Sequence, residues 1–283
     1  MTSASPPKLG LIAGGGELPV SLAMRCRAEG RPLFVLRLRG FAGPAMDAYE
    51  GAECGLGELG RAIKLFKAAG CGAICMAGQV DRPDFAKLKP DLRGVQALPG
   101  AIAAALNGDD ALLRWLVGEF EKEGFAVEGA DTINRTLVLG VGPLGALAPA
   151  ASHKSDIERA VTVARGIGRY DIGQGVVVVG GAVLAVETQE GTDAMLARCA
   201  TLNPDWRGTA EARHGVLAKL PKPIQERRVD LPTIGVATVE AAAACGLAGI
   251  VGEAGAMLVL DRPAVIAAAD RLGLFVHGIP PEG

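Results

Sequence analysis

Short apolar runs alternate with amphipathic segments along the first half of the chain. The runs have the length and composition of buried strands at KLGLIA (8–13), LFVLRL (33–38) and AICMA (73–77). Helical spacing of apolar positions follows in the segments 18–29, 58–69, 99–106 and 111–122. Strands that alternate with helices pair in parallel through crossover helices. The pattern therefore predicts a Rossmann-like α/β domain with a parallel sheet.

The second half has a different pattern, which begins after a stretch rich in Gly and Pro. That stretch, 135–150, contains no acidic residue and is expected to connect two domains. Two β-rich runs flank Gly180-Gly181, which is a strong hairpin signal. Further helices are expected over 155–166, 239–244 and 262–272, with a strand at 214–219. We therefore predict a Rossmann-like nucleotide-binding domain at 1–134, a connector at 135–150 and a mixed α/β catalytic and lipid-binding domain at 151–283.

Composition and charge exclude several classes of protein. A formal charge of −2, with two Trp and two Tyr, argues against a nucleic-acid partner. The six cysteines form no CxxC pair and the three histidines are scattered, which disfavours a zinc site. Cys71 and Cys75 lie in an apolar stretch and are expected to be buried thiols. No signal peptide is visible, and the uncharged tract 136–152 is broken by turn signals, so a soluble cytoplasmic protein is expected.

Three consecutive glycines follow the first predicted strand, and they are the strongest local signal in the first half. Gly14, Gly15 and Gly16 would let a backbone approach a phosphate and would present free N–H groups beside a helix N-terminus. The motif is neither GxGxxG nor a P-loop, so the ligand stays open, and a plain tight turn is the alternative. Gln79 and Arg82 follow the third strand, at the same predicted edge, and could contact a nucleobase or a phosphate.

Paired charges mark three further segments. Asp109 and Asp110 precede a helix, as a ligand site or as a plain helix cap. The segment 219–232 carries four cations, two carboxylates and three prolines, so it could hold a diphosphate or be a solvated loop. Carboxylates also gather in 187–193, and hydrolysis of a phosphoanhydride with Mg²⁺ requires such hard oxygen ligands.

Together these segments resemble the LpxI-type UDP-2,3-diacylglucosamine pyrophosphatases of lipid A biosynthesis. The matching stretches come in the family's order: LIAGGGELP (11–19), AGQVDRP (77–83), GDDALLR (108–114), DIGQGVVV (171–178), VETQEGTDAML (186–196), GVLAKLPKPIQERRVDLPTIG (215–235) and GLAGIVGEAG (246–255). They span nearly the whole chain, and the set as a whole is highly specific.

The resemblance implies a two-domain hydrolase that uses Mg²⁺ or Mn²⁺. It implies attack of water on the pyrophosphate of UDP-2,3-diacylglucosamine, with release of UMP and 2,3-diacylglucosamine 1-phosphate (lipid X). Asp230 matches an acidic position of the family and is expected to be a metal ligand or a base. Lys219, Lys222 and Gln225 match as catalytic phosphate or sugar contacts. Glu226 stands where the family pattern has Asp, and a longer carboxylate still reaches a metal.

Other expectations complete this interpretation. Gln174 and Thr192 lie in matching stretches as candidate substrate contacts, and Glu190 and Asp193 as candidate metal ligands beside Asp230. A mean hydropathy of +0.30 fits burial of acyl chains, and the substrate implies transient contact with the inner-membrane surface. A homodimer is expected by default, because closed pairs are the commonest assembly.

Two alternatives remain open from the residues. An oxidoreductase would use the glycine turn for a dinucleotide. LRLRG (36–40) lacks the acidic residue that binds the ribose of NAD, which disfavours NAD, although an arginine there could suit NADP. A non-catalytic sensor of UDP-sugars would have no need of the carboxylate-rich loops, and alanine at Asp230 would leave its binding unchanged.

Overall fold

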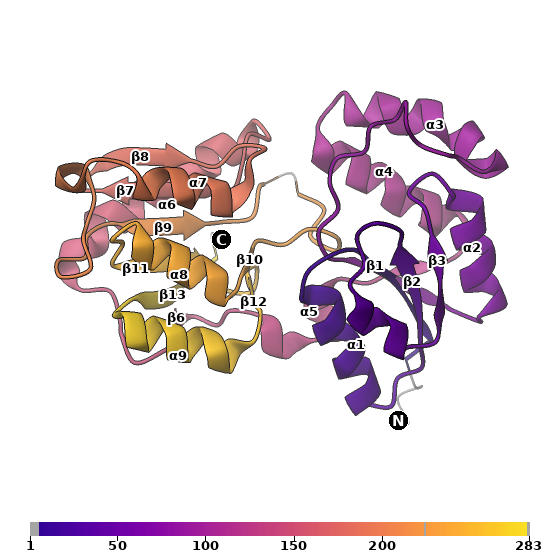
Figure 1. The fold of residues 1–283 in the computed structure, drawn as a ribbon, viewed down its shortest axis with the longest axis horizontal. Helices are drawn as coiled ribbons and strands as arrows, with labels where there is room; N and C mark the ends of the chain where they lie inside the picture. The colour runs from indigo at the N-terminus through magenta and orange to yellow at the C-terminus, as the bar shows by residue number, and fades with distance from the viewer. Residues whose placement is uncertain (1–5, 224, 282–283) are drawn as a thin grey trace. The chain divides into compact units, whose positions relative to one another are not determined.

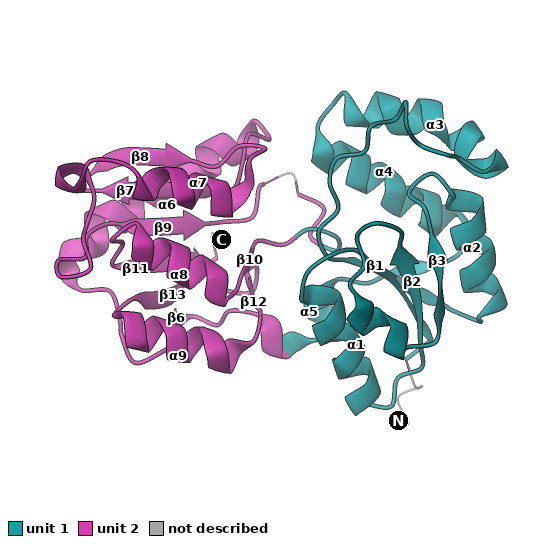
Figure 2. Ribbon diagram, in the orientation of Figure 1, with its two compact units in different colours: residues 1–135, 228–230 teal, residues 136–227, 231–283 magenta. Residues whose placement is uncertain are grey.

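The computed structural model describes residues 6–223 and 225–281, and the chain divides into two compact units (Figure 2). Unit 1 consists of Met1–Arg135 and Arg228–Asp230, and unit 2 consists of Thr136–Arg227 and Leu231–Gly283. The chain therefore passes between the units after residues 135, 227 and 230. The predicted domain limits at 134 and 150 remain predictions.

Unit 1 contains a five-stranded parallel sheet with the order β3-β2-β1-β4-β5 (Figure 1). Its strands are β1 (Leu9–Ala13), β2 (Leu33–Leu38), β3 (Gly51–Cys54), β4 (Ala73–Ala77) and β5 (Ala126–Val127). β1 and β4 are buried along their whole length, as expected for strands that are covered on both faces. The strand order reverses between β1 and β4, and this reversal is where open α/β sheets bind ligands.

The helices of unit 1 lie along the parallel sheet, and α2 has a clear apolar face. They are α1 (Leu18–Ala28), α2 (Leu59–Ala68), α3 (Leu92–Ala105), α4 (Asp109–Lys122) and the short α5 (Ala130–Ile133), with a 3₁₀ turn at Pro44–Ala48. In α2 the buried positions are Leu59, Ala62, Ile63 and Phe66, which is helical spacing. Phe66 also packs edge-to-face against Phe34, Phe120 and Phe125, with ring centroids 6.2–6.3 Å apart.

Helix α3 begins seven residues before the predicted start at Pro99, and Asp91 explains the difference. The Asp91 carboxylate accepts the N–H of Gly94 at 2.8 Å and so caps the helix. It also accepts the N–H groups of Gly60 and Arg61 at the start of α2, so one side chain ties two helix N-termini. Burial tends to raise the pKa of Asp91, but these backbone donors outweigh burial and lower that pKa.

Unit 2 contains a mixed six-stranded sheet with the order β6-β13-β11-β9-β7-β8 (Figure 1). Its strands are β6 (Gly142–Pro143), β7 (Gly175–Val179), β8 (Ala182–Val186), β9 (Val216–Lys219), β11 (Gly249–Glu253) and β13 (Phe275–Ile279). β9, β11 and β13 run parallel, whereas β6, β7 and β8 each run antiparallel to a neighbour. The predicted hairpin is confirmed: Gly180 and Gly181 connect β7 to β8, both at positive φ, which glycine adopts without strain.

The remaining elements of unit 2 surround this sheet and a two-stranded pair. The helices are α6 (Lys154–Arg169), α7 (Gly191–Ala200), α8 (Val236–Ala244) and α9 (Arg262–Leu272), with 3₁₀ turns at Ala151–His153 and Pro204–Trp206. β10 (Thr233–Ile234) pairs with β12 (Leu258–Val259), and a 3₁₀ turn at Arg135–Leu137 spans the first passage between units. The predicted fold class, a Rossmann-like parallel sheet with a mixed α/β second half, is confirmed. Within the described residues, no helix is both long and apolar enough to cross a membrane.

Candidate active site at the carboxyl edge of the parallel sheet

The glycine turn after β1 is joined to the turn after β4 by backbone hydrogen bonds. The N–H of Gly14 donates to the carbonyl of Ala77 at 2.8 Å, and Gly15 and Gln79 exchange N–H···O bonds of 2.8 and 2.9 Å. The expectation of free N–H groups at all three glycines is therefore wrong for Gly14 and Gly15. Their donors hold the β4 turn instead of facing a ligand.

Gly14 is required by space in this arrangement. A Cβ at Gly14 would lie 2.6 Å from the carbonyl oxygen of Gln79 and 2.9 Å from Cγ2 of Val80. Gly16, by contrast, has open space around it and a positive φ of 82°. The glycine turn thus fixes the backbone of the 78–82 segment. Gln79, predicted as a substrate contact, is exposed and serves here through its main chain.

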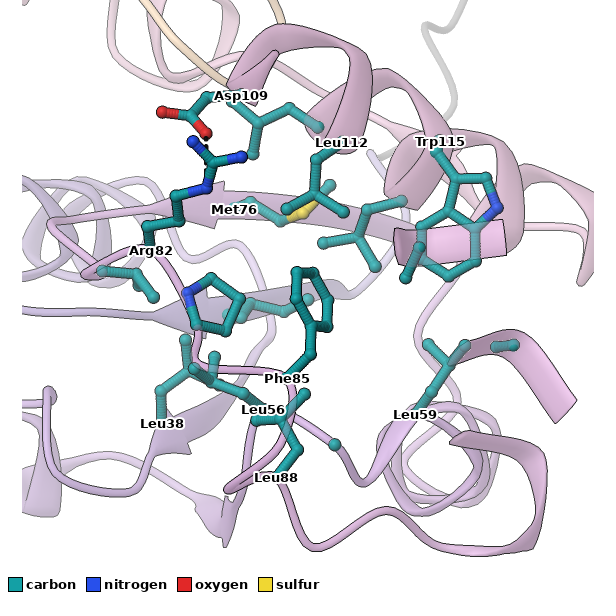
Figure 3. A pocket seen from close by; sticks show the side chains of 18 of the residues that line it. Leu38, Leu56, Leu59, Met76, Arg82, Phe85, Leu88, Asp109, Leu112 and Trp115 are labelled. Atoms are coloured by element: carbon teal, nitrogen blue, oxygen red, sulfur yellow. Dashed lines mark ion pairs between the residues drawn. The ribbon is translucent and has the colours of Figure 1, made fainter. Parts of the chain in front are cut away.

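A cavity of about 470 Å³ opens beside this turn, within the size range of small-molecule pockets. Its wall is mostly apolar and comes from the ends of β1, β2 and β4, from the segment 80–90, and from α3 and α4. Figure 3 shows Leu38, Leu56, Met76, Phe85, Leu112 and Trp115 around this space. The polar groups of the lining are few: Asp81, Arg82, Asp109 and Asp230.

Arg82 and Asp109 form an ion pair on the wall of the cavity, with 3.5 Å between Nε and Oδ1 (Figure 3). Arg82 also donates from Nη2 to the carbonyl of Ala105 at 2.8 Å, which ties it to the end of α3. Asp109 lies in the first turn of α4, where the helix dipole favours a carboxylate. The cap at this helix is Gly108, with no side-chain hydrogen bond, so Asp109 is not a plain cap. The GDD stretch was the available sequence signal for this residue.

Asp230 lines the same cavity, although it is far in sequence from the rest of unit 1, which ends at Arg135. Asp230 is the last of three residues, Arg228–Asp230, that belong to unit 1, whereas the segments on both sides of them belong to unit 2. Of the sequence-predicted catalytic and substrate-binding residues, Asp230 and Arg82 therefore share one pocket. The sequence did not reveal the apolar wall, because its members come from seven separate segments.

A second group of predicted residues gathers at one end of the unit 2 sheet. Lys219 is buried and donates from Nζ to the carbonyl of Thr233 at 2.8 Å. Lys222 pairs with Asp171 at 2.5 Å. Oε1 of Gln225 accepts a hydrogen bond from the backbone N–H of Lys222 at 2.9 Å, and Nε2 of Gln225 lies 3.4 Å from Oε1 of Gln174. The cations of this cluster are thus already engaged with oxygen atoms of unit 2.

The predicted metal ligands are not assembled within either unit. Asp230 belongs to unit 1, whereas Glu190 and Asp193 belong to unit 2. Glu190 pairs with Arg198 at 2.6 Å, and Asp193 is exposed in the first turn of α7, next to the buried Thr192. Glu226 is partly buried in unit 2. Among the residues that the structure describes, no three His, Cys, Asp or Glu side chains form a group that could hold a metal.

All six cysteines are free and buried. The expectation of buried thiols at Cys71 and Cys75 is confirmed. Burial raises the pKa of Cys54 to about 12, with a further contribution from Glu58, and it also raises the pKa of Cys71 and Cys75. Cys54, Cys71 and Cys75 are therefore packing residues and not nucleophiles of the site.

The parallel sheet with a pocket at its carboxyl edge defines a Rossmann-like ligand-binding unit, followed in the same chain by a second α/β unit. The model of the LpxI N-terminal domain matches residues 8–137, and that of the LpxI C-terminal domain matches residues 140–277. The chain belongs to the LpxI family.

A named relative supports this assignment along the whole chain. The UDP-2,3-diacylglucosamine pyrophosphatase LpxI of Caulobacter vibrioides is 62% identical over 275 residues, which cover 97% of this chain and 98% of that protein. Among solved structures, CobK precorrin-6A reductase is 13% identical, covers 98% of this chain and 89% of its own, and has a TM-score of 0.33. A likeness at that TM-score carries no argument about fold or function.

Proposed function

We propose that this protein hydrolyses the pyrophosphate bond of UDP-2,3-diacylglucosamine and releases UMP and 2,3-diacylglucosamine 1-phosphate (lipid X), a step of lipid A biosynthesis. The observation that carries the proposal is the 62% identity, over nearly the full length of both chains, to a pyrophosphatase of that name. The oxidoreductase and sensor alternatives find no support in the family assignment.

The chemistry of the unit 1 pocket supports this reaction. Hydrolysis forms a bond between a water oxygen and a phosphorus, breaks the bridging P–O bond, and releases a proton that a base must accept. Asp230 is the candidate for this base or for a metal ligand, because it is a carboxylate on the wall of the pocket and matches an acidic position of the family. Arg82, on the same wall, is the candidate cation that neutralises charge on the leaving phosphate.

The apolar part of the same pocket suits the lipid part of the substrate. Each methylene that moves from water into an apolar site contributes about 0.8 kcal/mol. A wall that includes Leu38, Met76, Phe85, Leu112 and Trp115 provides such a site next to the charged residues. We propose that an acyl chain of the substrate occupies this space in unit 1, in place of the domain at 151–283 that the sequence predicts to bind lipid.

Magnesium dependence belongs to the proposal as well. Mg²⁺ is commonly held by one or two carboxylates together with substrate phosphates, so it does not require a cluster of three protein ligands. The donors of the pocket fit that pattern, and Asp230 with Asp81 or Asp109 would hold the ion. The ion would supply positive charge to the pyrophosphate. Glu190 and Asp193 remain predicted ligands only.

The test is mass spectrometry of UDP-2,3-diacylglucosamine incubated with the wild type, Asp230→Asn and Asp84→Asn, each with Mg²⁺ and with EDTA. Asp84 is the matched control, because it is exposed, pairs with Lys87 and does not line the pocket. We expect UMP and lipid 1-phosphate from the wild type and from Asp84→Asn with Mg²⁺, and a loss of at least about 100-fold in Asp230→Asn. Turnover by Asp230→Asn at the wild-type rate would remove Asp230 from the mechanism. No turnover by the wild type would refute the function.

A further inference from the structure

Two residues that precede Asp230 make contacts that help to hold the segment Arg228–Asp230 in unit 1. Arg228 donates from Nη1 to Oε1 of Glu121 on α4 at 2.6 Å. Val229 packs against the apolar core of unit 1. The Cα of Arg228 also lies close to Gly129, 3.4 Å from where a Cβ of that glycine would be. An ion pair, an apolar contact and a close backbone approach thus all connect the segment to unit 1.

Arg228 and Val229 lie in a turn, and none of the three residues belongs to a helix or strand. Asp230 therefore gains no position from the hydrogen-bond ladder of a sheet or from a helix. Its place on the pocket wall depends on side-chain contacts nearby. Arg228 lies two residues before Asp230, and its ion pair with Glu121 connects the segment to α4. Other residues of α4, namely Asp109, Leu112 and Trp115, form part of the same pocket wall.

We infer that the Arg228–Glu121 ion pair is a positioning device that holds Asp230 in the pocket of unit 1. The inference rests on the proposed function, in which Asp230 acts on the pyrophosphate. Glu121 and Arg228 do not line the pocket, and in this inference both act through the backbone that carries Asp230. Displacement of a reacting group by about 1 Å costs on the order of 100-fold in rate, so a weakened attachment should be visible in kcat.

The pair suits a test by mutation because it is half exposed, with side-chain exposures of 41% and 46%. Ion pairs of that exposure contribute little to folding stability, so the variants should fold. Glu123→Gln is the matched control. Glu123 is two residues further along, directly after α4, and pairs with Lys67, which has no part in the 228–230 segment.

The experiment compares Glu121→Gln, Arg228→Gln, the double variant, Arg228→Lys and Glu123→Gln in the full-length protein. We expect kcat to fall about 10- to 100-fold in each of the first two variants, with a smaller change in KM. The double variant should lose no more than the worse single variant, because the two residues act as one pair. Arg228→Lys should recover part of the loss, and Glu123→Gln should retain the wild-type kcat.

Amide hydrogen exchange of residues 226–231 supplies a readout that does not depend on turnover. Exchange in this segment should accelerate in Glu121→Gln and Arg228→Gln and stay unchanged in Glu123→Gln. Wild-type kcat and unchanged exchange in Glu121→Gln would overturn the inference, and so would losses that multiply in the double variant. If the wild type itself shows no turnover, the proposed function fails, whereas the exchange measurement still decides whether the pair holds the segment.

Discussion

Two glycines of unit 1 should respond to alanine with opposite signs. At Gly14 the new Cβ would lie 2.6 Å from the carbonyl oxygen of Gln79, and neither backbone can move without breaking the Gly15–Gln79 bridge. At Gly118, inside α4, a Cβ would meet nothing within 4 Å. The first change adds a clash between main-chain segments, and the second adds only a better helix former.

The magnitude at Gly14 follows from two contributions. Overpacking in a site without free space costs about 1–3 kcal/mol. The loss of the two bridge hydrogen bonds, of 2.8 and 2.9 Å, adds about 1 kcal/mol each. Gly14→Ala should therefore lower the free energy of unfolding by about 3–5 kcal/mol, whereas Gly118→Ala should raise it by about 0.5–1 kcal/mol.

Urea unfolding followed by far-UV circular dichroism measures both changes in the transition of unit 1. Tryptophan fluorescence helps to assign each unfolding transition to a unit, because Trp115 lies in unit 1 and Trp206 in unit 2. Gly14→Ala should also lose turnover, because the bridge fixes the segment that carries Arg82. A Gly14→Ala protein as stable as the wild type would refute the reasoning, and so would a destabilised Gly118→Ala protein.

Three further predictions concern the helix cap, the thiols and the pocket. Asp91→Ala should lower the free energy of unfolding by about 1 kcal/mol near neutral pH. Because the folded-state pKa of Asp91 is lowered, this contribution is complete above the unfolded-state pKa of about 3.9. It is lost as the pH falls through the folded-state pKa. Urea titrations at neutral pH and at about pH 2 would detect the difference. A thiol reagent should label none of the six buried cysteines in the native protein and all six in denaturant; rapid native labelling would contradict the packing described. Shortening a pocket-bound acyl chain by two methylenes should reduce kcat/KM about 15-fold, as competition assays between two substrates measure, whereas equal rates would place that chain outside the pocket.

Much of the fold could be predicted because hydrophobic periodicity is a local property. The ranges 33–38, 73–77 and 262–272 coincide with β2, β4 and α9 as the structure has them. The start of α3 was wrong by seven residues, because Pro99 is also a favoured first residue of a helix and the capping role of Asp91 depends on its contacts. β3 was not predicted, since GAEC carries one buried residue in four and is a strand only through its pairing with β2.

The site could be predicted less completely, because it depends on which segments meet. Sequence motifs indicated Arg82 and Asp230 separately, and the structure brings both to one pocket. The motifs could not show that the N–H groups of Gly14 and Gly15 donate to the turn after β4, because that pairing is tertiary. The motifs also could not show that Asp230 belongs to a different unit from Glu190 and Asp193. Only the structure shows that residues 228–230 belong to unit 1 while their flanking segments belong to unit 2.

The return of residues 228–230 to unit 1 has a consequence for protein synthesis. The body of unit 1 is complete in sequence once Arg135 has left the ribosome, but its pocket lacks Asp230 until about 95 more residues have been made. At about 5–20 residues per second, that interval is on the order of 5–20 s. Throughout this interval the nascent chain contains the other lining residues of the pocket but lacks Val229 and Asp230. A gene fragment that ends at Arg135 would also lack Asp230, so under the proposed function we expect it to show no pyrophosphatase activity.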